Sequence, residues 1–158
     1  MGRQHLGEPV LVVGKLRLEV EDGRVAEGRN TITSGFQLMM AGAIFSALFD
    51  IADSLTLVQP ITYPALGLIG TGTGNPSFND TALFAQYASA PATGYSYGVG
   101  TVAYGSFSFQ FPAVSASTTF TEAGVSLAGK LINHGLFTNP VTVAAGYQYL
   151  LTVEFDVS

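Results

Sequence analysis

The strongest match to a catalytic motif in this sequence lies at residues 94–98 (GYSYG), which have the G-x-S-x-G spacing of a serine-hydrolase nucleophile elbow. Glu122 and His134 follow in the chain order in which α/β-hydrolases place their acid and histidine. An elbow needs a strand, a strained turn and then a helix, whereas the residues after Ser96 are strand-like and rich in glycine. We therefore expect these glycines to lie at a strand edge or in a loop, and we predict that the protein is not an enzyme.

A second glycine-rich run, residues 70–74 (GTGTG), raises the question of phosphate binding, because glycine lets backbone N–H groups approach a phosphate closely. No Gly-Lys-Ser/Thr follows, and the spacing is not G-x-G-x-x-G. Residues 75 and 76 (Asn-Pro) continue a turn where a helix would have to begin. We predict a tight turn between strands at this position and no bound cofactor.

Side chains that bind metal ions are scarce. The chain has no cysteine, and its two histidines lie in regions of different character. Asp50 with Asp53, and Asn79 with Asp80, offer oxygen ligands of the kind that calcium and magnesium prefer. The first pair fits the end of a helix and the second fits a turn, so we expect no metal site.

Glu122 is the one carboxylate in an otherwise uncharged, strand-like segment. A lone carboxylate provides no acid/base pair for catalysis. We expect it to accept hydrogen bonds from backbone groups or from a threonine, and therefore to be structural.

Aromatic residues suggest a different kind of site, because the chain contains eleven Phe and seven Tyr but no Trp. Tyr87, Tyr95, Tyr97 and Tyr104 lie close together in the sequence and could line a sugar-binding surface. Such tyrosines more often border a core or an interface with their hydroxyl groups in water. Both interpretations stay open at this point.

Composition excludes several classes of function. Only 11% of the residues are charged and 47% are apolar, so exposed Ser, Thr, Asn and Gly or contacts between subunits must keep the surface soluble. The net charge of −5, with no run of bases after residue 30, argues against nucleic-acid binding. The most apolar stretch, residues 36–49, is shorter than the roughly 20 residues of a membrane-spanning helix. We expect a soluble protein made in the cytoplasm.

Charge divides the chain into two regions, since ten of its seventeen charged residues lie in residues 1–30. Residues 15–21 (KLRLEVE) alternate polar and apolar side chains as a strand does, and Asp-Gly follows as a hairpin signal of type I′. We predict an extended N-terminal arm with a β-hairpin at residues 1–30 and a β domain at 31–158 that folds without it. The arm residues expected to bind a partner are Leu16, Leu18, Val20, Asp22, Gly23 and Arg24.

The second region combines one apolar helix, expected at residues 34–49, with several strands separated by turns. Phe107, Phe109 and Phe111 alternate with polar residues, and residues 147–157 alternate in the same way, which predicts a long final strand. The predicted fold is mostly β, an antiparallel sandwich or partly open barrel with one buried helix and an extended arm.

The order of several short segments resembles small virion proteins of tailed bacteriophages, of the head-decoration or tail-fibre type. The matching segments are residues 30–33 (NTIT), 68–73 (LIGTGT) with Pro76, 80–83 (DTAL), 122–124 (EAG), 131–137 and the ending 141–157. Together they cover about residues 30–157. The long Gly/Ser/Tyr stretch at 91–106 departs from the usual pattern.

The resemblance implies a non-enzymatic β domain on a virion, usually a homotrimer. We expect a protein that binds the outer surface of the major capsid protein and stabilises the shell, with its arm adding a strand to a neighbouring copy. The alternative is a tail-fibre component that recognises a host glycan. A fibre more often shows sequence repeats, and none is present.

Overall fold

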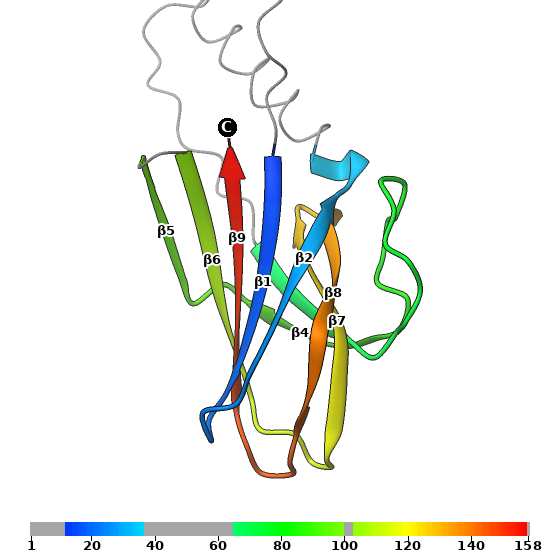
Figure 1. Ribbon diagram of the computed structural model, residues 1–158, viewed down its shortest axis with the longest axis vertical. Coiled ribbons are helices and arrows are strands. Elements are labelled where there is room, and N and C mark those ends of the chain that lie inside the picture. Colours follow the sequence, from blue (N-terminus) through cyan, green and yellow to red (C-terminus); the bar gives the residue numbers. More distant parts are fainter. Residues whose placement is uncertain (1–11, 37–64, 100–102, 158) are drawn as a thin grey trace, which may run out of the picture.

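The computed structural model describes residues 12–36, 65–99 and 103–157, and the protein is mostly β, as predicted (Figure 1). Nine strands form one antiparallel sheet, curled into half of a barrel, in the order β4-β3-β7-β8-β2-β1-β9-β6-β5. The strands are β1 (Val12–Val20), β2 (Val25–Ile32), β3 (Ala65–Gly70), β4 (Gln86–Pro91), β5 (Gly94–Val99), β6 (Ala103–Phe111), β7 (Thr118–Leu127), β8 (Lys130–Val143) and β9 (Tyr149–Val157).

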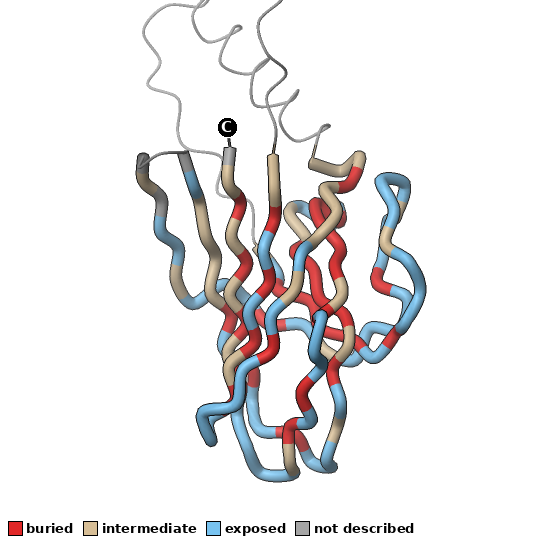
Figure 2. The backbone as a smooth tube through the Cα atoms, in the orientation of Figure 1, coloured by how far each residue is buried: buried red, intermediate tan, exposed pale blue. Residues whose placement is uncertain are grey.

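Alternation along the strands separates the core from the outer face of the sheet. Phe109 and Phe111 of β6 are fully buried, as the alternation predicted, and they pair in register with Leu151 and Tyr149 of β9. The sheet also folds back on itself, because a Cβ atom at Gly67 of β3 would lie 2.3 Å from the Phe109 ring. Buried residues accordingly follow the middle strands, where the two parts of the sheet face one another (Figure 2).

The predicted arm is wrong for residues 12–30, which form two central strands of the sheet. β1 pairs with β2 on one side and β9 on the other, and β2 pairs with β1 and β8. Leu16, Leu18 and Val20, expected to bind a partner, lie in the core with at most 4% exposure. Both strands therefore lie between two other strands of the same chain, and a domain beginning at residue 31 would lack β1 and most of β2. Residues 1–11 lie outside the described residues.

The hairpin expected at Asp22-Gly23 is present, but its turn is of a different type. Residues 21–24 lie between β1 and β2, and the Val20 N–H donates to the Arg24 carbonyl, so that residues 21–23 form the loop. The Gly23 N–H donates to the Val20 carbonyl, and of these three residues only Gly23 has a positive φ, of 90°. This is a three-residue loop with glycine in the left-handed conformation, whereas a type I′ turn needs two such residues. Arg24 and Asp22 form an ion pair of 2.7 Å at its exposed tip.

The other predicted elements agree with the structure where it describes them. The final strand is β9, which starts at Tyr149 because Gly146, with a φ of 89°, lies in the turn before it. Residues 34–36 are helical, and the remainder of the apolar helix expected at 34–49 lies outside the described residues, as do Asp50 and Asp53. No helix in the described part of the chain is long and apolar enough to cross a membrane.

Candidate functional site

The long connection between β3 and β4, residues 71–85, lies against the face of β7 and β8 that is turned away from the core (Figure 1). Glu122 of β7 and His134 of β8 point to this face, because their neighbours Ala123 and Val125 point into the core and Gly124 pairs with His134. The tight turn expected at residues 70–74 is therefore wrong: Gly70 ends β3, and a loop of irregular structure follows. We call residues 71–85 the latched loop.

Three titratable side chains attach the latched loop to the sheet. His134 Nδ1 lies 2.7 Å from Asp80 Oδ2, and His134 Nε2 lies 2.7 Å from Glu122 Oε2. Glu122 and His134 are completely buried, whereas the Asp80 side chain is 16% exposed. A carboxylate, an imidazole and a second carboxylate thus form one continuous chain from the loop into the sheet.

Glu122 accepts backbone hydrogen bonds, as the sequence predicted. Its Oε1 accepts from the N–H groups of Gly72 (2.9 Å) and Ala85 (2.7 Å), and its Oε2 accepts from Phe84 (2.9 Å). These donors come from the beginning and the end of the latched loop. One buried carboxylate therefore holds both ends of the latched loop, although Glu122 lies 37 to 50 positions after these donors in the chain.

Asp80 plays the same part at the middle of the loop. Its Oδ2 accepts the Ser77 N–H at 2.8 Å, and its Oδ1 accepts the Ser77 hydroxyl at 3.1 Å. Asp80 is thus the turn residue that the sequence predicted, with an additional partner in His134. Asn79 donates its N–H to the Ser77 hydroxyl oxygen. Asn79 and Asp80, which the sequence offered as oxygen ligands, therefore organise a turn.

The electrostatics of the site favour ionised carboxylates. Burial alone would raise the pKa of Glu122, but hydrogen bonds from the N–H groups of Ala85 and Phe84, from His134 and from Gly72 hold it below its usual value. The pKa of Asp80 is likewise lowered, because hydrogen bonds from Ser77 and His134 outweigh its partial burial. Each ring nitrogen of His134 lies within hydrogen-bond distance of one of these carboxylates.

Aromatic side chains complete the outer surface of the loop. The Phe84 ring packs on the His134 imidazole, with centroids 4.6 Å apart and planes at 54°. Phe84 is nevertheless 45% exposed and Phe78 is 43% exposed. Gly72 must be glycine, because a Cβ there would come within 2.5 Å of both Glu122 Oε1 and Phe84 Cβ. The loop thus presents two phenylalanine rings on a backbone that is fixed by its hydrogen bonds to Glu122.

The G-x-S-x-G segment does not join this network. Residues 94–98 lie within β5, an extended strand paired with β6, and Ser96 is exposed opposite Ser106. Four strands separate β5 from β8 in the sheet, so the order Ser96, Glu122, His134 does not correspond to a triad. Among the described residues, both nitrogens of His134 already contact carboxylates. The arrangement can fix a loop in place, but it leaves no nitrogen to take a proton from a nucleophile.

Three of the four tyrosines considered for glycan binding have described side chains, and these three do not form one surface. Tyr95 pairs with Phe107, which faces the core side, whereas Tyr104 pairs with Gly98 and lies on the opposite face of the β5–β6 hairpin. The Tyr87 ring packs edge-on against buried Phe120, with centroids 5.2 Å apart. A flat row of aromatic rings is therefore not present among these three residues.

Comparison with protein-family models, with curated proteins and with solved structures finds no match for this chain.

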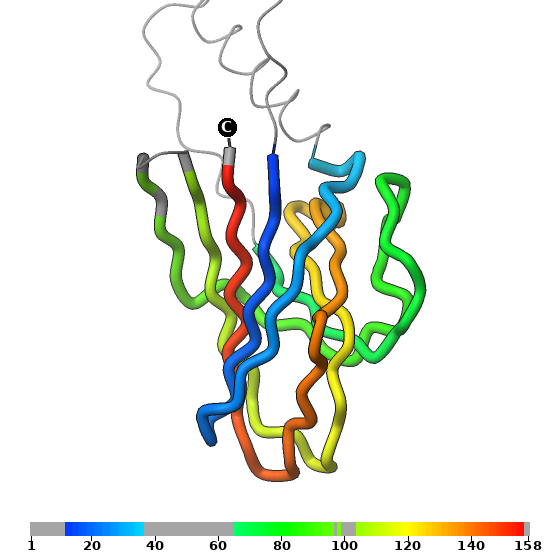
Figure 3. The backbone as a smooth tube through the Cα atoms, in the orientation of Figure 1, coloured from blue at the N-terminus to red at the C-terminus, as the bar shows by residue number. Residues whose placement is uncertain are grey.

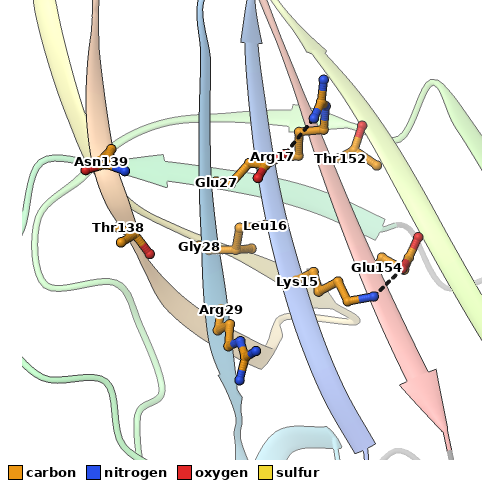
Figure 4. Close-up of a pocket in the computed structure, with 10 residues that line it drawn as sticks. All are labelled: Lys15, Leu16, Arg17, Glu27, Gly28, Arg29, Thr138, Asn139, Thr152 and Glu154. Atoms are coloured by element: carbon orange, nitrogen blue, oxygen red, sulfur yellow. Dashed lines mark hydrogen bonds and ion pairs between the residues drawn. The ribbon is translucent and has the colours of Figure 1, made fainter.

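Four of the charged residues expected in the arm, Lys15, Arg17, Glu27 and Arg29, instead line a groove of about 540 Å³ on the outer face of β1, β2, β8 and β9 (Figure 4). Lys15 contacts Glu154 at 3.1 Å, and Arg17 contacts Glu27 at 2.6 Å. Arg29 points into the groove without an ion pair to any described residue. Most of the charge on this face is thus neutralised locally, and the groove is polar without being strongly basic.

Proposed function

We propose that this chain is a structural protein of a bacteriophage virion, which binds the outer surface of the capsid and stabilises the shell. The observation that carries the proposal is the latched loop, in which a chain of two carboxylates and an imidazole fixes a surface segment with two exposed phenylalanines. The resemblance of the short sequence segments supports a virion protein, and the loop provides a surface suited to binding another protein.

The latched loop has the properties of a preorganised binding surface. Large apolar rings in a fixed position bind a partner at a small cost in conformational entropy. The Phe78 carbonyl accepts the Ser34 N–H, which fixes the backbone at Phe78, while its ring is 43% exposed. The major capsid protein is the proposed partner, with copies of this chain as neighbours on the shell.

The saturated network also favours a structural function over catalysis. Each oxygen of Glu122 and Asp80 accepts at least one hydrogen bond, and His134 is held from both sides. Buried charges are stabilised when every group is paired in this way. An acid/base catalyst instead needs a group that can exchange a proton with substrate.

The test is rebinding of purified chain to virus shells from which it has been removed. We expect Phe78→Ala to weaken binding about tenfold or more, since truncating an aromatic anchor of an interface commonly costs about 2 kcal/mol. Tyr147→Ala is the matched control, because Tyr147 is similarly exposed but follows the far end of β8. Unchanged occupancy with Phe78→Ala would contradict a role for the loop.

Counting copies per virion separates decoration from a tail appendage. Quantitative mass spectrometry of purified particles should find hundreds of copies for a decoration protein, since it covers a repeating lattice. A few to tens of copies would support the tail-fibre alternative, and a glycan array would then be the next measurement. Absence of the chain from purified particles would exclude both.

A further inference from the structure

The two edge strands of the sheet, β4 and β5, differ in how they are protected against pairing with another chain. An exposed edge is ordinarily blocked by charge, by proline or by a bulge. β4 ends in Pro91, and its pairing with β3 is interrupted by a register shift at Ile69/Gly70. β5 contains no proline and no charged residue, and it pairs with β6 in unbroken register from Gly94 to Val99.

The side of β5 that faces away from β6 lacks a strand partner among the described residues (Figure 3). We call it the β5 edge. Tyr95 of this strand is 78% exposed, the most exposed large apolar side chain in the described part of the chain. It lies on the core-facing side of the sheet, beside Phe107. The Tyr95 ring therefore extends the apolar face of the sheet as far as its edge strand, β5.

The charge distribution favours a second copy of this chain as the occupant. The protein carries a net charge of −5, so two copies repel one another wherever their charged surfaces meet. Residues 81–121 contain no charged side chain, and both strands of the β5–β6 hairpin fall within that range. The hairpin is therefore a surface at which two identical acidic molecules can meet without bringing like charges together.

We propose that β5 pairs antiparallel with β5 of a second copy and joins two sheets into one. This inference deepens the proposed function, on which it rests for its biological setting, by naming the contact between neighbouring copies. A two-fold axis perpendicular to the sheet generates such a pair, and it keeps the apolar faces of both copies on the same side. Tyr95 of each copy then lies on the shared apolar face, where cross-strand aromatic contacts stabilise the pairing.

The pairing is tested with purified chain alone, by light scattering and by sedimentation over a range of concentration. Ser96→Lys adds a charge to the outer face of the β5 edge and brings two like charges together across the two-fold axis. We expect it to raise the dissociation constant of the dimer about tenfold or more, a change of about 1.4 kcal/mol. The wild-type protein should have the mass of two chains, and this mass should fall to that of one chain on dilution.

Ser106→Lys is the matched control. Ser106 is the register partner of Ser96 on the same face, but it lies in β6, whose two sides are both occupied by strands of the same chain. The new lysine lies opposite Glu154 of β9, so the folded chain accommodates it. This variant should keep the wild-type mass.

Hydrogen exchange supplies a second measurement of the same contact. Amides of residues 94–99 should become protected as concentration rises in wild type and in Ser106→Lys, but not in Ser96→Lys. A wild-type chain that stays monomeric at all concentrations overturns the inference. So does a trimer, or a dimer that Ser96→Lys and Ser106→Lys leave equally intact. Rebinding to shells is measured separately: a monomer that binds shells contradicts only this contact, and a dimer that does not bind them contradicts only the proposed function.

Discussion

Asp80, His134 and Glu122 are joined inside the protein, whereas Lys15 and Arg17 meet their carboxylate partners on the outer face of β1. The contacts have similar lengths, 2.7 Å in the buried chain and 2.6 to 3.2 Å on the surface. Their surroundings differ completely. The buried groups have exchanged water for a fixed set of hydrogen-bond donors, and the surface groups remain in water.

This difference teaches where an ion pair has consequences for structure. Removing charged groups from water costs several kcal/mol each, so the buried pairs persist only because backbone N–H groups also point at the carboxylates. The latched loop, whose Leu83 also packs with Leu68 and Leu131, is thereby held in one conformation. Surface pairs need no such support, and their loss is compensated by solvent.

The largest expected effect comes from Glu122→Gln, which keeps the shape of the side chain but places an NH₂ group where His134 and backbone N–H groups donate. Breaking one partner of a buried pair commonly costs about 3–5 kcal/mol. The free energy of unfolding, measured by urea denaturation at neutral pH, should fall by about that amount, and amide exchange in residues 71–85 should accelerate most.

Glu154→Gln is the control for this comparison, because it makes the same chemical change in an exposed carboxylate paired with Lys15. Its urea midpoint should equal that of the wild type within error. Equal effects of the two substitutions would remove the distinction between buried and surface pairs. Where Glu122→Gln does not yield folded protein, Asp80→Asn offers a milder break, since Asp80 is partly exposed.

Acid should act mainly through the buried chain. The pKa values of Glu122 and Asp80 are lower in the folded protein than their ordinary values, so ionisation of both groups favours folding. That contribution is complete above the unfolded-state values of about 4.3 and 3.9, and it is lost as the pH falls through the lower folded values. Stability should therefore decline steeply below about pH 4.

Denaturation midpoints measured from about pH 7 down to about pH 3 test this expectation. Asp22, whose pKa is lowered by its hydrogen bond with Arg24, contributes to the same decline. The comparison with Glu122→Gln isolates the buried group, because that variant should show a shallower dependence on pH. A variant with the wild-type slope would show that Glu122 does not titrate with unfolding.

Local patterns in the sequence predicted those features that depend on neighbouring residues. Alternation predicted β6 and β9, and the isolated position of Glu122 among uncharged residues predicted an acceptor of backbone hydrogen bonds. The contact of His134 with Asp80 was missed, because it joins residues 54 positions apart and requires the β3–β4 loop to fold over β8. No periodicity reports such a contact.

The arm was mispredicted for a related physical reason. The concentration of charge in residues 1–30 was interpreted as a separate segment, but the charged residues of 12–30 lie on the outer face of two central strands or in the turn that joins them. An alternating strand with one charged face looks the same in sequence whether its apolar face meets a neighbouring subunit or its own domain. The partners of β1 and β2, β9 and β8, begin more than 90 residues later in the chain.

The smallest expected effect is at the surface pairs themselves. Lys15 contacts both Glu154 and Asp156, and its side chain is more than half exposed. We expect Lys15→Gln to leave the urea midpoint unchanged, because water and salt replace the lost contacts. Repeating the measurement in about 1 M salt, where the screening length is about 3 Å, should likewise leave wild type and variant alike. A clear loss of stability in Lys15→Gln at low salt that disappears at high salt would mean that charges on the outer face contribute to the free energy of folding. Burial would then not decide which ion pairs stabilise the protein.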